Sequence, residues 1–183
     1  GAGGTGKTTT AKWIAENLSI PFLPSASRVV YEEQSLTEDL VNTWDADKKW
    51  ELQRNIFDKK IEQDDTTGSF VADRTLLDHW AYCLMYCALD LDKKTFSTME
   101  NTVRKHMLST YTNILYFPWG YWEGESDGVR QDNPAWQSAI DAILVGYCIR
   151  WRLPVVEVPQ TKGPEIRHEF IKNNLLGVKG MED

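Results

Sequence analysis

Apolar residues recur along this chain in two alternating patterns, which are helical stripes and short continuous runs. Leu77, Trp80 and Leu84 show helical spacing, whereas residues 113–117 form a continuous run of the kind found in buried strands. The helical spacing predicts helices at residues 7–18, 33–43, 47–63, 76–89, 95–109, 134–150 and from 164 onward. The continuous runs predict strands at residues 20–23, 69–72, 113–117 and 155–158. Because strands alternate with helices, we predict a three-layer α/β fold with helices flanking a mainly parallel sheet.

The composition favours a single compact domain covering residues 1–183. Hydrophobic residues make up 42% of the chain and charged residues 26%, as in an ordinary globular protein. The formal net charge of −7 argues against a broadly basic surface for nucleic acid. No apolar run approaches the roughly 18 residues that span a bilayer, so no membrane partner is expected. The three cysteines, Cys83, Cys87 and Cys148, are typical of reduced thiols in a cytoplasmic protein.

The first eight residues, GAGGTGKT, match the phosphate-binding pattern G-x-x-x-x-G-K-[ST] at every fixed position. Its glycines let successive backbone N–H groups point at phosphate oxygens, and the following helix directs its positive end at the same anion. Lys7 is placed to neutralise the β- and γ-phosphates, and the Thr8 hydroxyl is placed to ligate Mg²⁺. The motif predicts binding of a nucleoside triphosphate with Mg²⁺ by Gly1, Gly3, Gly4, Thr5, Gly6, Lys7, Thr8 and Thr9.

A phosphate-binding loop of this kind should follow a buried strand at the centre of the sheet. The sequence begins on the first glycine of the loop. We therefore expect a first strand in residues upstream of Gly1 in the natural protein.

Ligands in an open α/β sheet bind beyond the carboxyl ends of its strands, and this rule singles out residues 25–28, Asp73-Arg74 and the loop after Phe117. A carboxylate at Asp73 can hold Mg²⁺ or accept a proton from an acceptor hydroxyl, and Arg74 can orient an anionic part of the acceptor. The alternative for Asp73 is a purely structural role as a helix cap or in a surface ion pair. We favour the role in Mg²⁺ binding or proton transfer.

A glycine-rich, aromatic loop at about residues 118–133 has the length and composition of a lid. Arg130 within it can reach the γ-phosphate and stabilise charge in the transition state. The alternative for Arg130, which the sequence leaves equally open, is a solvated loop residue. Aromatic side chains such as Trp119 are better interpreted as cover for the edge of the core than as base-stacking groups.

Other groups of polar residues carry weaker signals. Cys83 and Cys87 lie one helical turn apart, but two ligands are too few for a zinc site, so core thiols are favoured. His106 and His168 have no partner visible in the sequence. The acidic cluster Glu62, Asp64 and Asp65 is interpreted as a solvated helix end.

Together these motifs resemble the small P-loop kinases. The resemblance rests on the phosphate loop, on Asp73-Arg74, on the Asp-Gly-x-Arg sequence at 127–130 and on a late strand followed by a helix with Arg167. It is closest to the AAA-type ATPase/kinase group, which includes nicotinamide-riboside-kinase-like domains and many phage proteins. Asp73-Arg74 is also similar to the Asp-Arg motif of thymidylate kinases.

This resemblance implies an NMP-kinase-like fold, ATP as donor, and a nucleoside, nucleotide or related hydroxyl as acceptor. Asp73 would be the catalytic or magnesium-linked carboxylate, Arg74 would contact the acceptor, and Arg130 would be a lid arginine. In the segment PSASR at 24–28, Arg28 matches the family pattern, but Ser25 stands where relatives often carry glutamate. The change places more weight on Asp73 and puts ordinary free-nucleoside specificity in doubt, with Ser25 and Arg28 on the acceptor side.

One phage group within this resemblance phosphorylates 5-hydroxymethyluracil inside DNA, so a modified base in DNA is an alternative acceptor, and the compartment would then be the host cytoplasm. A second hypothesis is a nucleotide-hydrolysing ATPase or switch module without a small acceptor. A third is a nucleotide-binding module without catalysis, which would be favoured if Asp73 pointed away from the phosphate loop. The short chain and its internal lid arginine favour the kinase.

Overall fold

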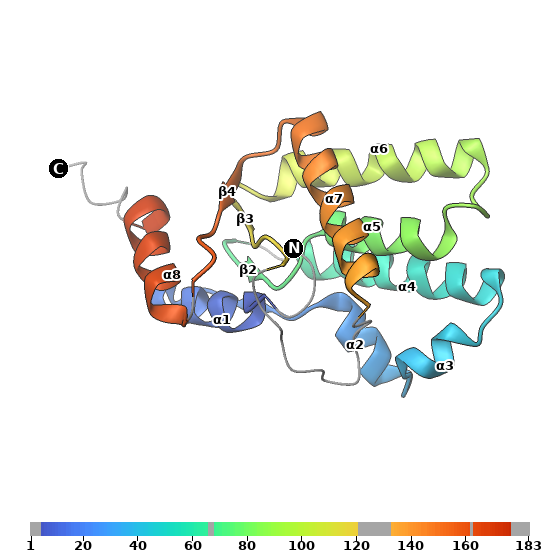
Figure 1. The fold of residues 1–183 in the computed structure, drawn as a ribbon, viewed down its shortest axis with the longest axis horizontal. Helices are drawn as coiled ribbons and strands as arrows, with labels where there is room; N and C mark the ends of the chain where they lie inside the picture. Colours follow the sequence, from blue (N-terminus) through green and yellow to red (C-terminus); the bar gives the residue numbers. More distant parts are fainter. Residues whose placement is uncertain (1–4, 66–67, 121–132, 162, 177–183) are drawn as a thin grey trace.

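Helices and short strands alternate along the computed structural model, which describes residues 5–65, 68–120, 133–161 and 163–176 (Figure 1). The helices are α1 (Lys7–Leu18), α2 (Ala26–Glu33), α3 (Glu38–Asn42), α4 (Ala46–Asp64), α5 (Leu76–Cys87), α6 (Lys93–Thr110), α7 (Pro134–Trp151) and α8 (Pro164–Ile171), the last continuing into a π-helical turn at Lys172–Leu176. The strands are β1 (Phe22–Leu23), β2 (Val71–Ala72), β3 (Ile114–Tyr116) and β4 (Val155–Glu157). The predicted α/β fold with parallel strands is confirmed.

The strands form two parallel pairs rather than one hydrogen-bonded sheet within the described residues. β1 pairs with β2 and β3 pairs with β4. Between β2 and β3 lies a cavity of about 340 Å³, lined by consecutive residues of both strands and by α1 residues such as Ala11 and Ile14. Side chains of consecutive strand residues project to opposite faces of a sheet. Because consecutive residues of β2 and of β3 all line the cavity, each strand turns its edge, and not one face, toward it. A further strand would be needed there to join the pairs, and the strand expected upstream of Gly1 remains a prediction.

The helix boundaries follow local signals where those signals are strong. The side chain of Asn133 caps α7 by accepting hydrogen bonds from two backbone N–H groups, and Pro134 starts the helix. The helix predicted at 33–43 is right only over α3, because residues 34–37 form a turn and irregular chain that separates α3 from α2. α2 begins directly after Ser25 because its apolar residues Ala26 and Val30 pack with residues of α3 and α4 in a small separate core.

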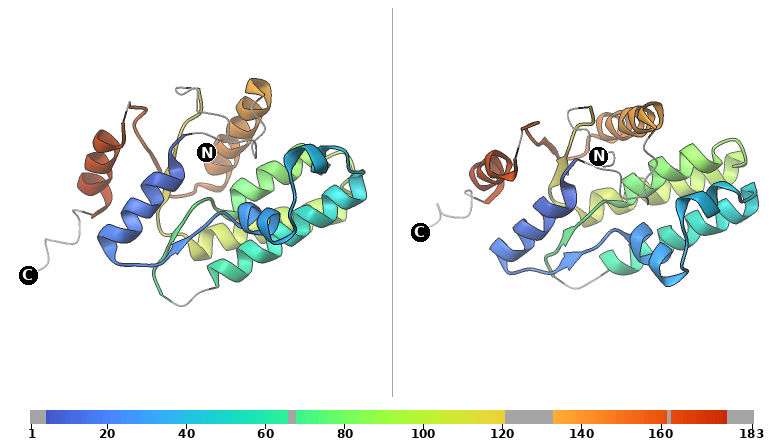
Figure 2. Two further views of the ribbon diagram at one scale, coloured as in Figure 1. Left: turned by 90° about the horizontal axis from the view of Figure 1, so that it is seen from below. Right: turned by 60° about the horizontal axis from the view of Figure 1, so that its bottom comes forward.

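The main core lies where α4, α5, α6 and α7 pack together beside β3. Trp80 on α5 is fully buried in it and meets Phe57 of α4 edge-on, with ring centroids 6.2 Å apart. On the other side of the strands α1 lies beside α8, so the strands stand between two groups of helices (Figures 1 and 2). Among the helices of the described segments, none has the length and apolar character needed to cross a membrane.

The end of α4 carries a buried ion pair that the sequence did not indicate. Lys60 donates to Asp64 at 2.7 Å, and both side chains are fully buried. His106 lies 2.9 Å from the other carboxylate oxygen, to which Tyr111 also donates a hydrogen bond. The interpretation of Asp64 as part of a solvated helix end is therefore wrong, and His106 has a partner. Four groups brought together from α4, α6 and the following turn satisfy one another away from water.

Candidate active site

The phosphate loop enters α1 through a residue whose backbone favours glycine. Gly6 stands before α1 with φ of +80°, in the left-handed region that side chains rarely adopt. Lys7 opens the helix and its ammonium donates to the Thr5 hydroxyl at 3.0 Å. Thr8 and Thr9 follow in the first turn, where backbone N–H groups have no carbonyl partner within the helix. Gly6 and Lys7 therefore lie at a helix N-terminus, where an anion can bind, and anion binding by the loop remains a prediction. Gly1, Gly3 and Gly4 lie outside the described residues.

Thr8 and Asp73 meet although they are 65 residues apart in the sequence. The Thr8 hydroxyl donates to the Asp73 carboxylate at 2.6 Å, which is a short, charge-assisted hydrogen bond. Asp73 is 5% exposed and lies directly after β2, with its N–H bonded to the carbonyl of Leu23. The strand pairing therefore carries the carboxylate to the phosphate loop. The cap of the next helix, α5, is made by Thr75 and Asp78 instead, which argues against a capping role for Asp73.

Arg74 adopts a strained backbone beside this contact. Its φ is +82°, in the left-handed region, although it neither is a glycine nor ends a helix. Its guanidinium lies over the ring of Tyr82 at 5.0 Å and donates to the Tyr82 hydroxyl at 3.5 Å. Burial lowers the pKa of Arg74, but Tyr82, Asp78 and Asp73 raise it by more, so the group keeps its charge. Strain at a partly buried, charged residue is typical of functional sites.

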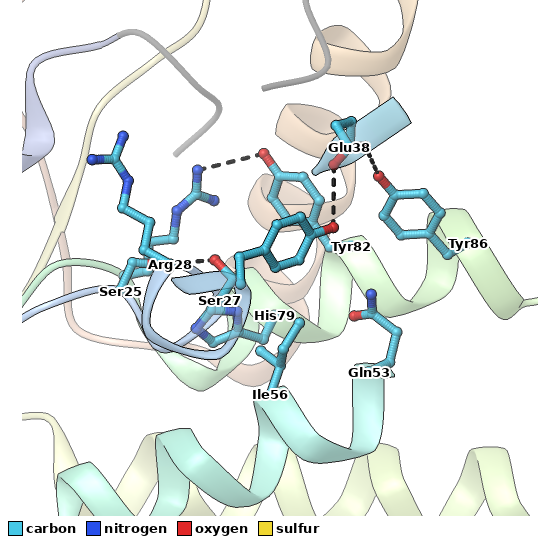
Figure 3. Close-up of a pocket in the computed structure, with 11 residues that line it drawn as sticks. Ser25, Ser27, Arg28, Glu38, Gln53, Ile56, His79, Tyr82 and Tyr86 are labelled. Carbon is cyan, nitrogen blue, oxygen red and sulfur yellow. Dashed lines mark hydrogen bonds between the residues drawn. The ribbon is translucent and has the colours of Figure 1, made fainter. Parts of the chain in front are cut away.

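A pocket opens next to Arg74, between α2, α4 and α5 (Figure 3). Its wall includes all three residues predicted for the acceptor side, which are Ser25, Arg28 and Arg74. The Ser25 hydroxyl lies 2.9 Å from that of Ser27, and Ser25 is only 2% exposed. The structure therefore brings residues that follow β1 and β2 together in the wall of one pocket.

The pocket is also lined by residues that no sequence pattern had singled out. Glu38 of the five-residue helix α3 accepts hydrogen bonds from Tyr86 and, at 3.2 Å, from Tyr31 (Figure 3). Burial and the Glu38 carboxylate raise the pKa of both tyrosines, so they remain hydrogen-bond donors. Gln53 is 4% exposed on α4 and faces the same space. These residues carry no recognisable motif and become neighbours only when α2, α3, α4 and α5 pack together.

His79 adds an uncharged polar group to the pocket wall. Burial lowers its pKa to about 3, and the nearby charges of Lys60 and Arg74 lower it as well. The imidazole is therefore neutral at physiological pH. His79 and Gln53 are thus uncharged hydrogen-bonding groups in the pocket wall. The cations Arg28 and Arg74 line the same pocket.

Two other predictions have different outcomes. Arg130 and most of the lid at about 118–133 lie outside the described residues, so their roles remain predictions. Cys83 and Cys87 are free, buried thiols in the core, as favoured from their spacing. In the described part of the chain, no cluster of three or more histidine, cysteine or acidic side chains is placed to hold a metal ion.

The parallel strands, the glycine-led helix α1 and the carboxylate after β2 define a P-loop domain of the NMP-kinase-like type. A family model described as "AAA domain" matches residues 1–165, and the chain belongs to this family. No curated protein sequence matches the chain significantly.

Two kinds of solved structure share the fold. Deoxyadenosine kinase from M. mycoides with bound dATP has a TM-score of 0.68 and 15% identity, over 96% of this chain and 95% of that one. NadR protein in complex with NR has a TM-score of 0.69 and 18% identity, over 100% of this chain and 50% of that one. At these identities the likeness establishes the fold.

Proposed function

We propose that this protein is a kinase that transfers the γ-phosphoryl group of ATP to a hydroxyl of a nucleoside-type acceptor. The proposal rests chiefly on the 2.6 Å contact between Thr8 and Asp73. It places a carboxylate at the phosphate loop, next in the sequence to Arg74, which lines the pocket. A nucleotide-binding module without catalysis would be favoured if Asp73 pointed away from the phosphate loop, whereas its carboxylate contacts Thr8. The similarity in fold to a deoxyadenosine kinase supports the same proposal.

Mg²⁺ fits the donor set at this point. Thr8 and Asp73 supply hard oxygen atoms, and Mg²⁺ in phosphoryl-transfer sites takes one or two protein ligands and completes its shell with phosphates and waters. The absence of a larger acidic cluster among the described residues agrees with such a site. When bound, the ion would neutralise charge on the phosphate oxygens.

The chain's own residues then have separate roles in the proposed transfer. Lys7 neutralises the triphosphate, while Arg74 and Arg28 orient the acceptor. The acceptor oxygen forms the new bond to the γ-phosphorus, the bond to the β-phosphate oxygen breaks, and ADP leaves. Asp73 accepts the proton of the attacking hydroxyl. Arg130 is proposed to stabilise the transferring group from the lid.

The pocket favours an acceptor with an uncharged, hydrogen-bonding part. Gln53, Glu38 and neutral His79 match the donors and acceptors of a base or sugar, and the tyrosines supply apolar contact area. The deoxyadenosine kinase has also been solved with the products dCMP and dCDP, so that protein binds a nucleoside monophosphate and a nucleoside diphosphate. A 5-hydroxymethyluracil base in DNA is the alternative acceptor, and Arg28 in the pocket wall is compatible with it.

A transfer assay with γ-labelled ATP tests the proposal. Deoxynucleosides, nucleoside monophosphates, nicotinamide riboside, and DNA with and without hydroxymethyluracil would be offered separately. We expect label on a nucleoside-type compound. Asp58→Asn, an exposed change on α4, is the control variant and should be as active as the wild type. Label only in DNA would move the acceptor to the modified base, and label only in inorganic phosphate would overturn the kinase in favour of an ATPase.

A further inference from the structure

Arg167 of α8 contacts the phosphate loop from the far end of the chain. Its Nη1 donates to the backbone carbonyl of Thr5 at 2.9 Å, across 162 positions of sequence. Thr5 is 7% exposed, so this carbonyl sits in a largely dry environment, where a charged donor is stronger than in water. The transfer mechanism above makes no use of this guanidinium.

The loop backbone fits closely around the guanidinium. A Cβ atom built on Gly6 would lie 2.4 Å from Nη1 of Arg167 and 3.1 Å from its Cζ. Real Cβ contacts of that length do not occur, so a side chain at position 6 would displace the arginine. Gly6 is thus required both by its φ of +80° and by the approach of Arg167.

Side-chain contacts between α1 and α8 hold Arg167 in place. His168 stacks on Trp13 of α1, with ring centroids 3.9 Å apart and an interplanar angle of 7°. The Lys172 ammonium lies 5.6 Å from the centre of the Trp13 ring, and Ile171 is fully buried. The two helices lie side by side in Figure 1. Arg167 therefore approaches the loop from a docked helix and not from a free side chain.

We propose that Arg167 is a positioning residue that fixes the peptide between Thr5 and Gly6 for binding the triphosphate. In a planar trans peptide the C=O and the following N–H point in opposite directions. Holding the Thr5 carbonyl toward Arg167 turns the Gly6 N–H away from it, toward the inside of the loop. This inference rests on the proposed use of the loop for ATP, and it makes α8 part of the donor site.

Direct ATP binding by the full chain tests the inference, with variants Arg167→Met and Arg167→Lys. A charged hydrogen bond to a buried carbonyl is strong, so we expect Arg167→Met to raise the Kd for ATP about tenfold or more. The KM for the acceptor should stay unchanged, and Arg167→Lys should recover part of the affinity. Arg54→Met, an exposed arginine on α4, is the matched control. Unchanged ATP affinity, or equal losses for ATP and acceptor together with a large fall in Tm, would overturn the role.

A double-mutant cycle with Gly6→Ala isolates the contact itself. If Arg167 crowds position 6, Gly6→Ala should lose less ATP affinity in an Arg167→Ala background than in the wild type. Simple additivity would show that the two positions act separately and would contradict the inference. Because the readout is ATP binding, a protein that binds ATP and phosphorylates no nucleoside refutes the proposed function while the result for Arg167 still stands.

Discussion

Replacing Asp73 with asparagine is expected to separate ATP binding from phosphoryl transfer. The amide keeps the size of the carboxyl group and one oxygen that can accept from Thr8 at the present 2.6 Å. It loses the negative charge and cannot take a proton at neutral pH. Asp73→Asn therefore removes the proposed chemistry while leaving the geometry in place.

The two effects differ in magnitude. A charge-assisted hydrogen bond is roughly twice as strong as a neutral one, so the Thr8 contact weakens by about 1 kcal/mol. The protein makes this contact before ATP binds, so the Kd for ATP should change by less than the corresponding factor of about five. Loss of a general base lowers kcat by about 10²–10⁴-fold. We therefore expect a large fall in kcat with a small change in Kd.

The assay is the initial rate of labelled transfer at saturating ATP and acceptor, alongside calorimetric titration with ATP. Repeating the rates over a range of Mg²⁺ concentrations separates the two roles of Asp73. If it mainly holds the ion, high Mg²⁺ restores activity, whereas loss of a base persists. A kcat within tenfold of wild type at every Mg²⁺ concentration, with Asp58→Asn equally active, would refute the reasoning.

Other positions give further predictions. Lys7→Ala should abolish ATP-dependent turnover without a change in circular dichroism, because the triphosphate loses its nearest cation. Unchanged turnover would contradict the assignment of residues 1–8 as a phosphate-binding loop. Arg130→Ala should lower kcat more than ATP affinity, and equal losses would make it a binding residue only. Asp64→Asn leaves the Lys60 ammonium buried without a counter-charge, so the free energy of unfolding measured in urea should fall by about 3–5 kcal/mol. A fall of less than about 1 kcal/mol would contradict the buried pair. The folded pKa of His79, about 3, lies below its ordinary value of 6.5, so the unfolded chain binds more protons between these values and stability falls as pH drops through this window. The loss from His79 alone is about 2 kcal/mol by about pH 5, and a stability curve for His79→Gln with the same slope as wild type would show that His79 is not its cause.

The local sequence predicted the features that depend on neighbouring residues. The helix expected at 47–63 matches α4, and Asn133-Pro134 marks the start of α7, because stripes and caps are set within a few positions of each other. The same holds for the helix expected at 7–18, which matches α1. The error at 33–43 arose where tertiary packing decided the outcome, since α2 and α3 are stabilised by contact with α4.

The sequence by itself also determined that Asp73 ends a strand, and thereby that its carboxylate belongs at the binding edge of the sheet. Only the tertiary structure decided which side chains from other parts of the chain gather at the phosphate loop and in the pocket. Pairing of β1 with β2 places Asp73 against Thr8, helix packing assembles Glu38 and Gln53 into one pocket, and docking of α8 brings Arg167 to the loop. Contacts between residues tens of positions apart leave no periodic trace in the chain, because they depend on how whole elements pack and not on the order of neighbouring residues.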